Sequence, residues 1–112
     1  MAKSLVNDLN KRVTILRPPG PDDVDEAGQP IDEWQPVTIV WAAIEPLSGR
    51  ELFAAQQANA EVTTKVTIRY RDDVDRTMKV RHNKSGAEFE ILYDINPKFA
   101  NVKLELMCKE QQ

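Results

Sequence analysis

The chain has 112 residues, of which 41% are hydrophobic and 29% charged, and its formal net charge is −3. This composition is typical of one ordered globular domain and argues against a disordered chain. The negative net charge argues against a protein that grips nucleic acid through its phosphates, because such binding needs clustered Lys and Arg side chains.

A single cysteine, Cys108, excludes an internal disulfide and a metal cage built from thiolates. The first residues, MAKSLVNDLNKR, lack the apolar core of a signal peptide, and no apolar run is long enough to span a membrane. We therefore expect a protein of the cytoplasm with no membrane contact. Residues 1–10 are expected to form an N-terminal arm or a short helix, with Leu5 and Leu9 on one face.

Three segments follow the arm. Residues 11–17, KRVTILR, alternate apolar and polar side chains, which predicts a strand. Residues 18–30, PPGPDDVDEAGQP, contain four prolines, two glycines and four mutually repelling carboxylates, so we expect a flexible acidic loop without regular structure. Residues 31–47 predict a long strand that is interrupted at Pro36 by a bulge or a sheet edge. Its VTIVWAAI core is apolar on both faces, which indicates burial on both sides by the fold or by a partner.

The stretch after this strand is predicted to be helical. Ser48 to Glu51 spell a capping box, in which the Ser48 hydroxyl would accept a backbone N–H and the Glu51 side chain would reach back to the cap. The following LFAAQQANA contains strong helix formers and no β-branched residue. We expect this helix to end near Asn59 or Ala60.

Four more strands are predicted in the second half of the chain, at 61–71, 77–82, 87–95 and 101–109, with a hairpin turn at 83–86. Together with the first two strands they predict a mainly β fold: a small antiparallel barrel of about six strands, with one short helix between strands 2 and 3, in a single domain over residues 1–112. The side chains expected to face inward are Val62, Thr64, Val66, Ile68, Tyr70, Met78, Val80, Ala87, Phe89, Ile91, Tyr93, Ile95, Val102, Leu104, Leu106 and Cys108.

The sequence offers little for catalysis. His82 directly precedes a predicted hairpin turn and has no accompanying nucleophile signature, so we interpret it as an exposed structural histidine. Cys108 falls on an inward strand face, where a buried structural thiol is expected. No glycine-rich phosphate loop is present. We predict no catalytic residue and no cofactor.

The acidic stretch partly resembles a calcium-binding loop. With Asp23 as the first ligand, Asp25 and Gly28 would stand at the third and sixth positions. However, Ala27 occupies the fifth position and Trp34 the twelfth, where a bidentate carboxylate is required. We therefore predict no metal site.

The remaining features concern surfaces. Large aromatic side chains are mostly buried, so Trp41 is expected in the core, whereas Trp34 beside the acidic loop is expected to be half covered. The predicted helix lacks the Lys/Glu pairs of an ordinary exposed helix and carries Leu52 and Phe53 side by side. Two alternatives stay open: the helix closes one end of the barrel, or it faces a partner.

Several segments resemble the phage head–tail joining protein family, the small head-completion or stopper proteins of long-tailed phages and prophages. They are RVTILR, DEAGQPIDEW, VWAAIEPLSGRELFAAQQANAEVTTKVTIRYR, MKVR, FEI and LELMCKE. The resemblance runs from about Lys11 to Glu110. Its most specific part is W-A-x-I-E-P-L-S-G-R-E-L-F-A-A-Q-Q-x-x-A-E-V-T, followed by I-R-Y-R.

The resemblance implies a structural protein of the virion neck, assembled in the bacterial host cytoplasm. Copies would form a dodecameric ring below the portal and its adaptor, close the DNA channel after packaging and provide the surface to which the tail attaches. The implied partners are other copies of the chain, the portal or adaptor protein, a tail terminator or tail-completion protein, and genomic DNA that passes without sequence-specific binding.

The resemblance also places a channel-lining plug at residues 45–63. The expected plug or subunit-interface residues are Ser48, Arg50, Glu51, Leu52, Phe53, Gln56, Gln57 and Asn59. Candidate partner contacts in and beside the acidic loop are Asp22, Asp23, Asp25, Glu26 and Trp34. The alternative is a stand-alone SH3-like protein-binding module without a virion role, which would need an aromatic cluster on one exposed face. Aromatic residues make up only 6% of the chain, which disfavours it.

Overall fold

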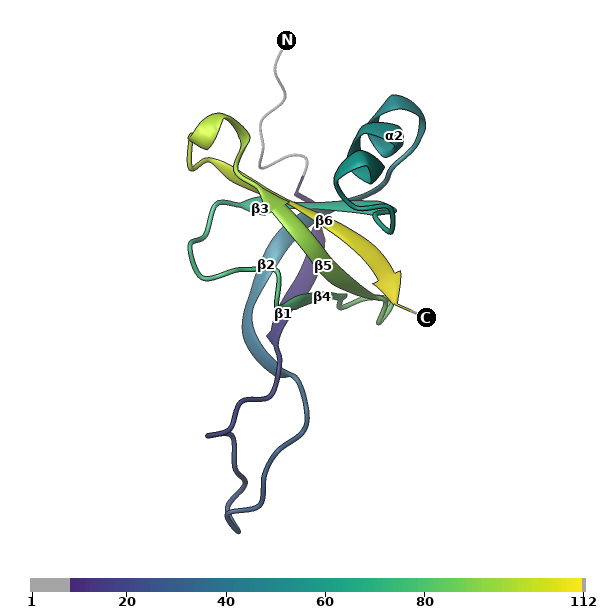
Figure 1. The fold of residues 1–112 in the computed structure, drawn as a ribbon. Coiled ribbons are helices and arrows are strands. Elements are labelled where there is room, and N and C mark those ends of the chain that lie inside the picture. Colours follow the sequence, from purple (N-terminus) through teal and green to yellow (C-terminus); the bar gives the residue numbers. More distant parts are fainter. Residues whose placement is uncertain (1–8, 112) are drawn as a thin grey trace.

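The computed structural model describes residues 9–111, so the predicted arm at 1–10 lies almost entirely outside the described residues. The described chain forms six strands, one α-helix and one short 3₁₀ turn (Figure 1). Their bounds are β1 Lys11–Arg17, β2 Gln35–Pro46, α2 Gly49–Ala58, β3 Thr64–Arg69, β4 Lys79–His82, β5 Glu88–Ile95, η1 Pro97–Phe99 and β6 Lys103–Gln111.

The strands close into one antiparallel barrel. Their order around the barrel is β1-β2-β3-β6-β5-β4, and β4 pairs back with β1 (Figure 1). Closure satisfies the backbone hydrogen-bonding groups that an open sheet of this size would leave at its edges. The predicted fold class, including one helix between the second and third strands, is confirmed.

The barrel interior is filled by one set of alternating side chains. The buried cluster contains Val13, Ile15, Ala42, Val66, Ile68, Val74, Val80, Phe89, Ile91, Leu104, Leu106 and Cys108. Most of the predicted inward positions are thereby confirmed. Ile95 is 39% exposed and Val102 is also exposed, and Val62 and Tyr93 pack in a separate apolar cluster outside this interior, so these four predictions are wrong. The register of β5 against β6 shifts between Ile91 and Tyr93, which turns the end of β5 away from the core, and Val102 precedes β6.

The outer face of β2 is open to solvent. Trp41 is 50% exposed and Ile39 is also exposed, so the predicted core position of Trp41 is wrong, and the fold does not bury both faces of β2. Burial of the outer face by a partner stays a prediction. A closed barrel has a single interior, and successive residues of a strand point to opposite faces. Pro36 pairs with Leu16 beside a register shift in β1, which confirms the predicted irregularity there.

The acidic segment between β1 and β2 is a hydrogen-bonded hairpin, whereas a loop without regular structure was predicted. Val24 forms an isolated antiparallel bridge with Pro30. Asp23 Oδ2 accepts from the Gly20 N–H at 2.7 Å, and Asp25 Oδ1 accepts from the N–H groups of residues 27 and 29 at 2.9 Å. Two of the carboxylates expected to repel one another therefore order the backbone instead. We call residues 18–33 the acidic hairpin; it projects from one end of the barrel (Figure 1).

The assignment of interior positions can be tested on one strand. Replacing buried Ile91 by Asp places an unpaired charge in the core at a cost of several kcal/mol, against a total stability of about 5–15 kcal/mol for such domains. We expect the I91D protein to lose its cooperative thermal unfolding transition. The matched change Ile95→Asp, at the exposed end of the same strand, should leave that transition in place. A soluble I91D protein that melts cooperatively would contradict the assignment.

Candidate interaction surface

Helix α2 packs on the outer wall of the barrel through a second apolar cluster. Its buried members are Leu47, Ala55, Val62 and Met107, and Leu52, Leu92 and Tyr93 pack against them. Leu106 and Cys108 point into the barrel core, so Met107 between them faces outward and receives the helix. The helix therefore covers wall residues and does not close an end of the barrel. The Tyr93 hydroxyl donates to the Ala55 carbonyl at 3.2 Å and ties wall and helix together.

The helix begins without the predicted capping box. Ser48 is the residue before the helix, as predicted, but its side chain forms no capping hydrogen bond. Gly49 has φ +57, a left-handed conformation that suits glycine and departs from a regular helix entry. Glu51 pairs with the Lys65 ammonium of β3 at 2.9 Å instead of reaching back to the cap. Burial acts to lower the pKa of Lys65, but the hydrogen bond to Glu51 and the nearby Glu105 outweigh it, and the pKa is raised.

Four of the eight predicted segment residues make contacts with the barrel or within the insert. Besides Glu51, Leu52 packs in the second cluster, and the Gln56 side-chain amide donates to the Val62 carbonyl at 3.1 Å. Asn59 Oδ1 accepts from the Glu61 N–H at 2.9 Å just after the helix. Glu51 and Leu52 thus attach α2 to the barrel, and Gln56 and Asn59 order the segment between α2 and β3.

The other four residues form an outward face. Ser48, Arg50, Phe53 and Gln57 are exposed and make none of the side-chain hydrogen bonds or ion pairs of residues 9–111. Phe53 stands out because 69% of it is exposed. We call these four residues the outer face of α2. Arg50 is its only charged member, so the face is nearly neutral and has an apolar centre.

A second exposed aromatic lies on the turn between β5 and β6, at the same end of the barrel as α2 (Figure 1). Phe99 is 90% exposed, and Lys98, Phe99 and Asn101 all have positive φ. Such conformations cost free energy in residues other than glycine and persist where neighbouring contacts impose them. Asn96 and Asn101 supply those contacts, with side-chain Nδ2 to Oδ1 at 2.7 Å and the Asn101 N–H to Asn96 Oδ1 at 3.1 Å. The sequence, with Asn-Pro at 96–97, predicts only a turn here.

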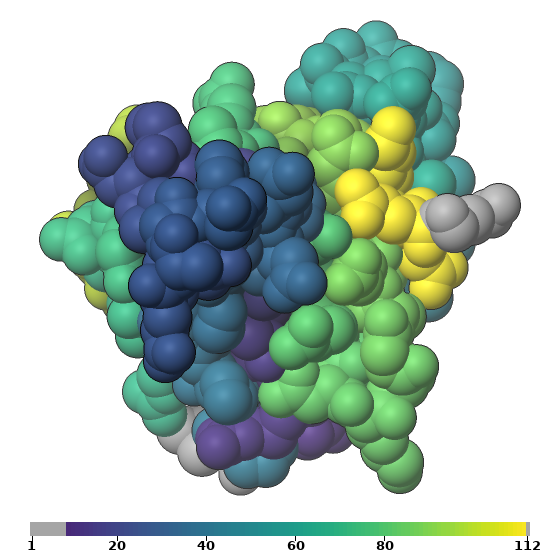
Figure 2. Space-filling view, turned by 90° about the horizontal axis from the view of Figure 1, so that it is seen from below, coloured from purple at the N-terminus to yellow at the C-terminus, as the bar shows by residue number. Residues whose placement is uncertain are grey.

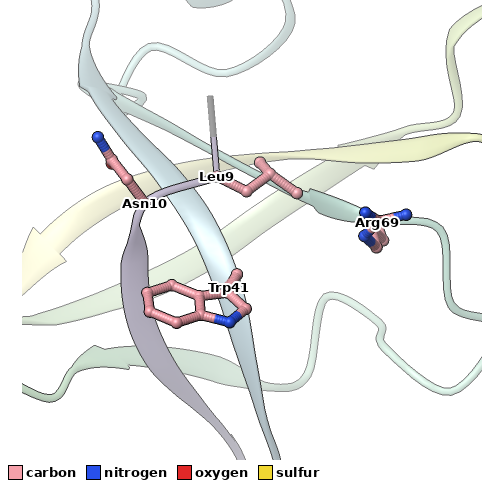
Figure 3. A pocket seen from close by; sticks show the side chains of 4 residues that line it. All are labelled: Leu9, Asn10, Trp41 and Arg69. Atoms are coloured by element: carbon pink, nitrogen blue, oxygen red, sulfur yellow. The ribbon is translucent and has the colours of Figure 1, made fainter. Parts of the chain in front are cut away.

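An open groove of about 410 Å³ runs along the wall formed by β1, β2 and β3. Trp41 and Arg69 border it together with Leu9 and Asn10, which directly precede β1 (Figure 3). A second hollow continues it along the wall and shares Trp41 and Arg69. We call the two together the wall groove, with Arg12, Ile39, Trp41, Arg69, Tyr70 and Arg71 as its main lining. The wall groove exists because Trp41 lies on the outer face of β2, a position that the apolar pattern of this strand does not indicate.

The candidate contacts of the acidic hairpin fall into two classes. Asp23 forms a bidentate pair with Arg17 at 2.7 and 2.9 Å, which lowers the pKa of its carboxyl to about 2, and Asp25 bonds to the hairpin backbone. Asp22 and Glu26 are exposed and bond to no other residue of the described chain. The first two therefore shape the hairpin, and the last two are available to a partner. Trp34, expected to be half covered, is partly exposed, and the Lys79 ammonium lies 4.5 Å from its ring centroid.

The reactive side chains occupy structural positions. His82 Nδ1 lies 2.8 Å from Ser85 Oγ within the β4–β5 turn. Burial raises the pKa of the Cys108 thiol to about 12, which keeps it from acting as a thiolate nucleophile. Among residues 9–111, no group of three or more His, Cys, Asp or Glu side chains is placed to hold a metal ion. No helix in that range is long and apolar enough to cross a membrane.

The chain is similar in sequence to proteins of known role. The chain matches the model of the phage head completion protein family over residues 5–111. It belongs to this family. It is also 28% identical over 88 residues to head completion protein gp7 of Enterobacteria phage HK97, an alignment that covers 76% of this chain and 79% of that protein. The predicted family is therefore confirmed.

The solution structure of protein SF1141 from Shigella flexneri 2a shares the fold, with a TM-score of 0.67, 24% identity and 96% of each chain covered. At that identity the likeness bears on the fold alone. The family match gives this head completion protein a structural role in completing the phage head, at the virion neck and in contact with other connector components.

The division of the helix into holding and outward residues predicts different effects for two adjacent changes. Leu52→Ser removes apolar packing from the second cluster and should lower the free energy of unfolding by about 1–3 kcal/mol, less than for a fully buried leucine. Phe53→Ser should change it by less than about 0.5 kcal/mol, because the ring is exposed. Chemical denaturation of the two purified variants measures both values. Equal losses would show that Phe53 also belongs to the core.

The Arg17–Asp23 pair predicts a pH dependence of the hairpin. The Asp23 pKa lies below its ordinary value of 3.8, so the ionised carboxylate stabilises the folded hairpin. This contribution is fully present above about pH 4 and is lost as the pH falls through about 2. A carboxyl NMR titration should find the low midpoint in the wild type and a value near the ordinary one in Arg17→Gln. An ordinary midpoint in the wild type would show that the pair does not form.

Proposed function

We propose that copies of this head completion protein form a dodecameric ring below the portal and its adaptor. The ring closes the DNA channel after packaging and provides the surface to which a tail terminator or tail-completion protein attaches. The observation that carries this proposal is the outer face of α2. The insert is fixed to the barrel by its own contacts, yet Phe53 remains 69% exposed. Aromatic side chains, phenylalanine included, are enriched in protein–protein interfaces relative to the rest of the surface.

The charge of that face suits a surface that DNA slides past. Strong binding to duplex DNA requires several Lys or Arg side chains at the phosphates. The outer face of α2 carries one, Arg50, among neutral side chains. Such a face can block or line a channel without gripping its contents. The exposed Phe99 turn at the same end of the barrel adds a second contact point for a connector protein.

The stand-alone binding module remains the second candidate function. The exposed Trp41 and the adjacent Tyr70 in the wall groove are the observation that favours it, because aromatic grooves bind extended peptides. A gene that stands apart from portal and capsid genes would support that function over the connector.

Electron microscopy of particles from a phage or prophage that lacks this gene tests the proposal. We expect tailless heads that leak DNA, and restoration by the wild-type gene. Phe53→Ser should restore DNA-filled tailed particles at least ten-fold less well, while the control Arg81→Ser, an exposed change on β4, should restore them fully. Normal tailed particles in the absence of the gene would overturn the proposed function.

A further inference from the structure

Acidic and basic residues are distributed unevenly along the chain. The acidic hairpin, residues 18–33, carries six of the 18 acidic residues and none of the 15 basic ones, so the rest of the chain is net positive. In the view from below, the hairpin stands in front of the barrel in dark blue, and teal α2 lies at its periphery (Figure 2). One chain thus presents a negative protrusion and a positive barrel.

The wall groove has the chemistry of a carboxylate-binding surface. The Arg12 guanidinium lies over the Trp41 ring, 4.7 Å from its centroid, and Arg69 borders the same space from β3. Arg71 is already paired with Asp73 at 2.8 Å, whereas Arg12 and Arg69 form no ion pair within residues 9–111. Arginine binds carboxylates through two parallel N–H donors, and the half-exposed indole beside it offers apolar contact.

The acidic hairpin carries the complementary set. Asp22 and Glu26 are exposed and uncommitted, while Asp23 and Asp25 hold the hairpin in shape. Val24 lies between them in the sequence and is also exposed. The hairpin thus offers two unpaired carboxylates beside the apolar Val24. The groove offers two unpaired guanidinium groups beside the Trp41 indole, so the two surfaces are complementary in charge and in apolar contact.

A chain cannot place its own hairpin in its own groove. The hairpin leaves the barrel after Arg17, five residues beyond Arg12 on β1, which is about 17 Å along an antiparallel strand. It then continues away from the barrel (Figure 1). The hydrogen bonds within the hairpin and the Arg17–Asp23 pair oppose a fold-back. The partner of the groove is therefore sought on another molecule.

We propose that the acidic hairpin of one copy docks into the wall groove of the next copy. Asp22 and Glu26 pair with Arg12 and Arg69, and Val24 packs on Trp41. This inference rests on the proposed function, because it supplies the contact between neighbouring subunits of the ring. The two surfaces are different patches of one chain, so the contact is heterologous, and repetition closes into a ring when the rotation per subunit allows it.

Charge reversal in the gene-deleted phage tests the contact. Asp22→Lys with Glu26→Lys alters only the hairpin, and Arg12→Glu with Arg69→Glu alters only the groove. Each pair should lower the yield of DNA-filled tailed particles at least ten-fold. All four changes in one chain should restore the yield to within a few-fold of the wild type, because the reversed hairpin again fits the reversed groove.

The outcomes separate this contact from the proposed function. A wild-type yield from either pair would overturn the docking contact and leave the connector role intact. Failure of the combined chain to recover, although it melts like the wild type, would assign the groove to another connector protein or to DNA and would also overturn the contact. Normal particles without the gene would overturn the function itself.

A cross-linking experiment covers the case in which a charge-reversed chain does not fold. Ala27→Cys on the hairpin and Ile39→Cys in the groove are made in separate full-length chains, and the native Cys108 is buried. Mild oxidation of the mixture should give a disulfide-linked heterodimer in yields at least ten-fold above those of Ala27→Cys mixed with Arg81→Cys on β4. Equal yields from the two mixtures would overturn the contact.

Discussion

Closure of six short strands into one barrel is the constraint on which the rest of the molecule depends. The closed barrel has a single small interior, which takes one alternating set of side chains, including Ile15, Val66 and Leu106. Every apolar residue on the opposite set must lie outside. Helix α2 covers one such residue, Met107, and leaves another, Trp41, in an open groove. The helix that covers Met107 and the groove around the uncovered Trp41 are therefore the surfaces available for assembly.

The two sides of helix α2, in the insert between β2 and β3, have different contacts. One side packs on the wall through Leu52 and Ala55 and is fixed by Tyr93, Gln56 and the Glu51–Lys65 pair. The other side presents Phe53 and neutral or singly charged neighbours to the surroundings. Of the two alternatives that the sequence left open, closure of a barrel end is excluded because the helix packs on the wall, and the partner-facing role stays a prediction.

The period-two pattern of the strands predicted the barrel and most of its interior, because alternation directly encodes which side chains share a face. It failed where the face depended on distant pairing: Ile95 turns outward beyond a register shift, and the doubly apolar β2 gave no signal that Trp41 lies outside. The capping box failed because Lys65 of β3 offers Glu51 a charged partner. For the segment at 45–63 the sequence left barrel closure and a partner contact open, and its division into holding and outward residues required the packing of α2 on β5 and β6.

Cryo-electron microscopy of the neck in tailed particles of the phage that carries this gene would show directly how the protein assembles. We expect a ring of these barrels next to the portal and its adaptor, with the outer face of α2 against the channel or a neighbouring connector protein, and each acidic hairpin in the wall groove of the adjacent copy. A neck that lacks the protein, or a ring in which the outer face of α2 points to bulk solvent, would contradict this expectation.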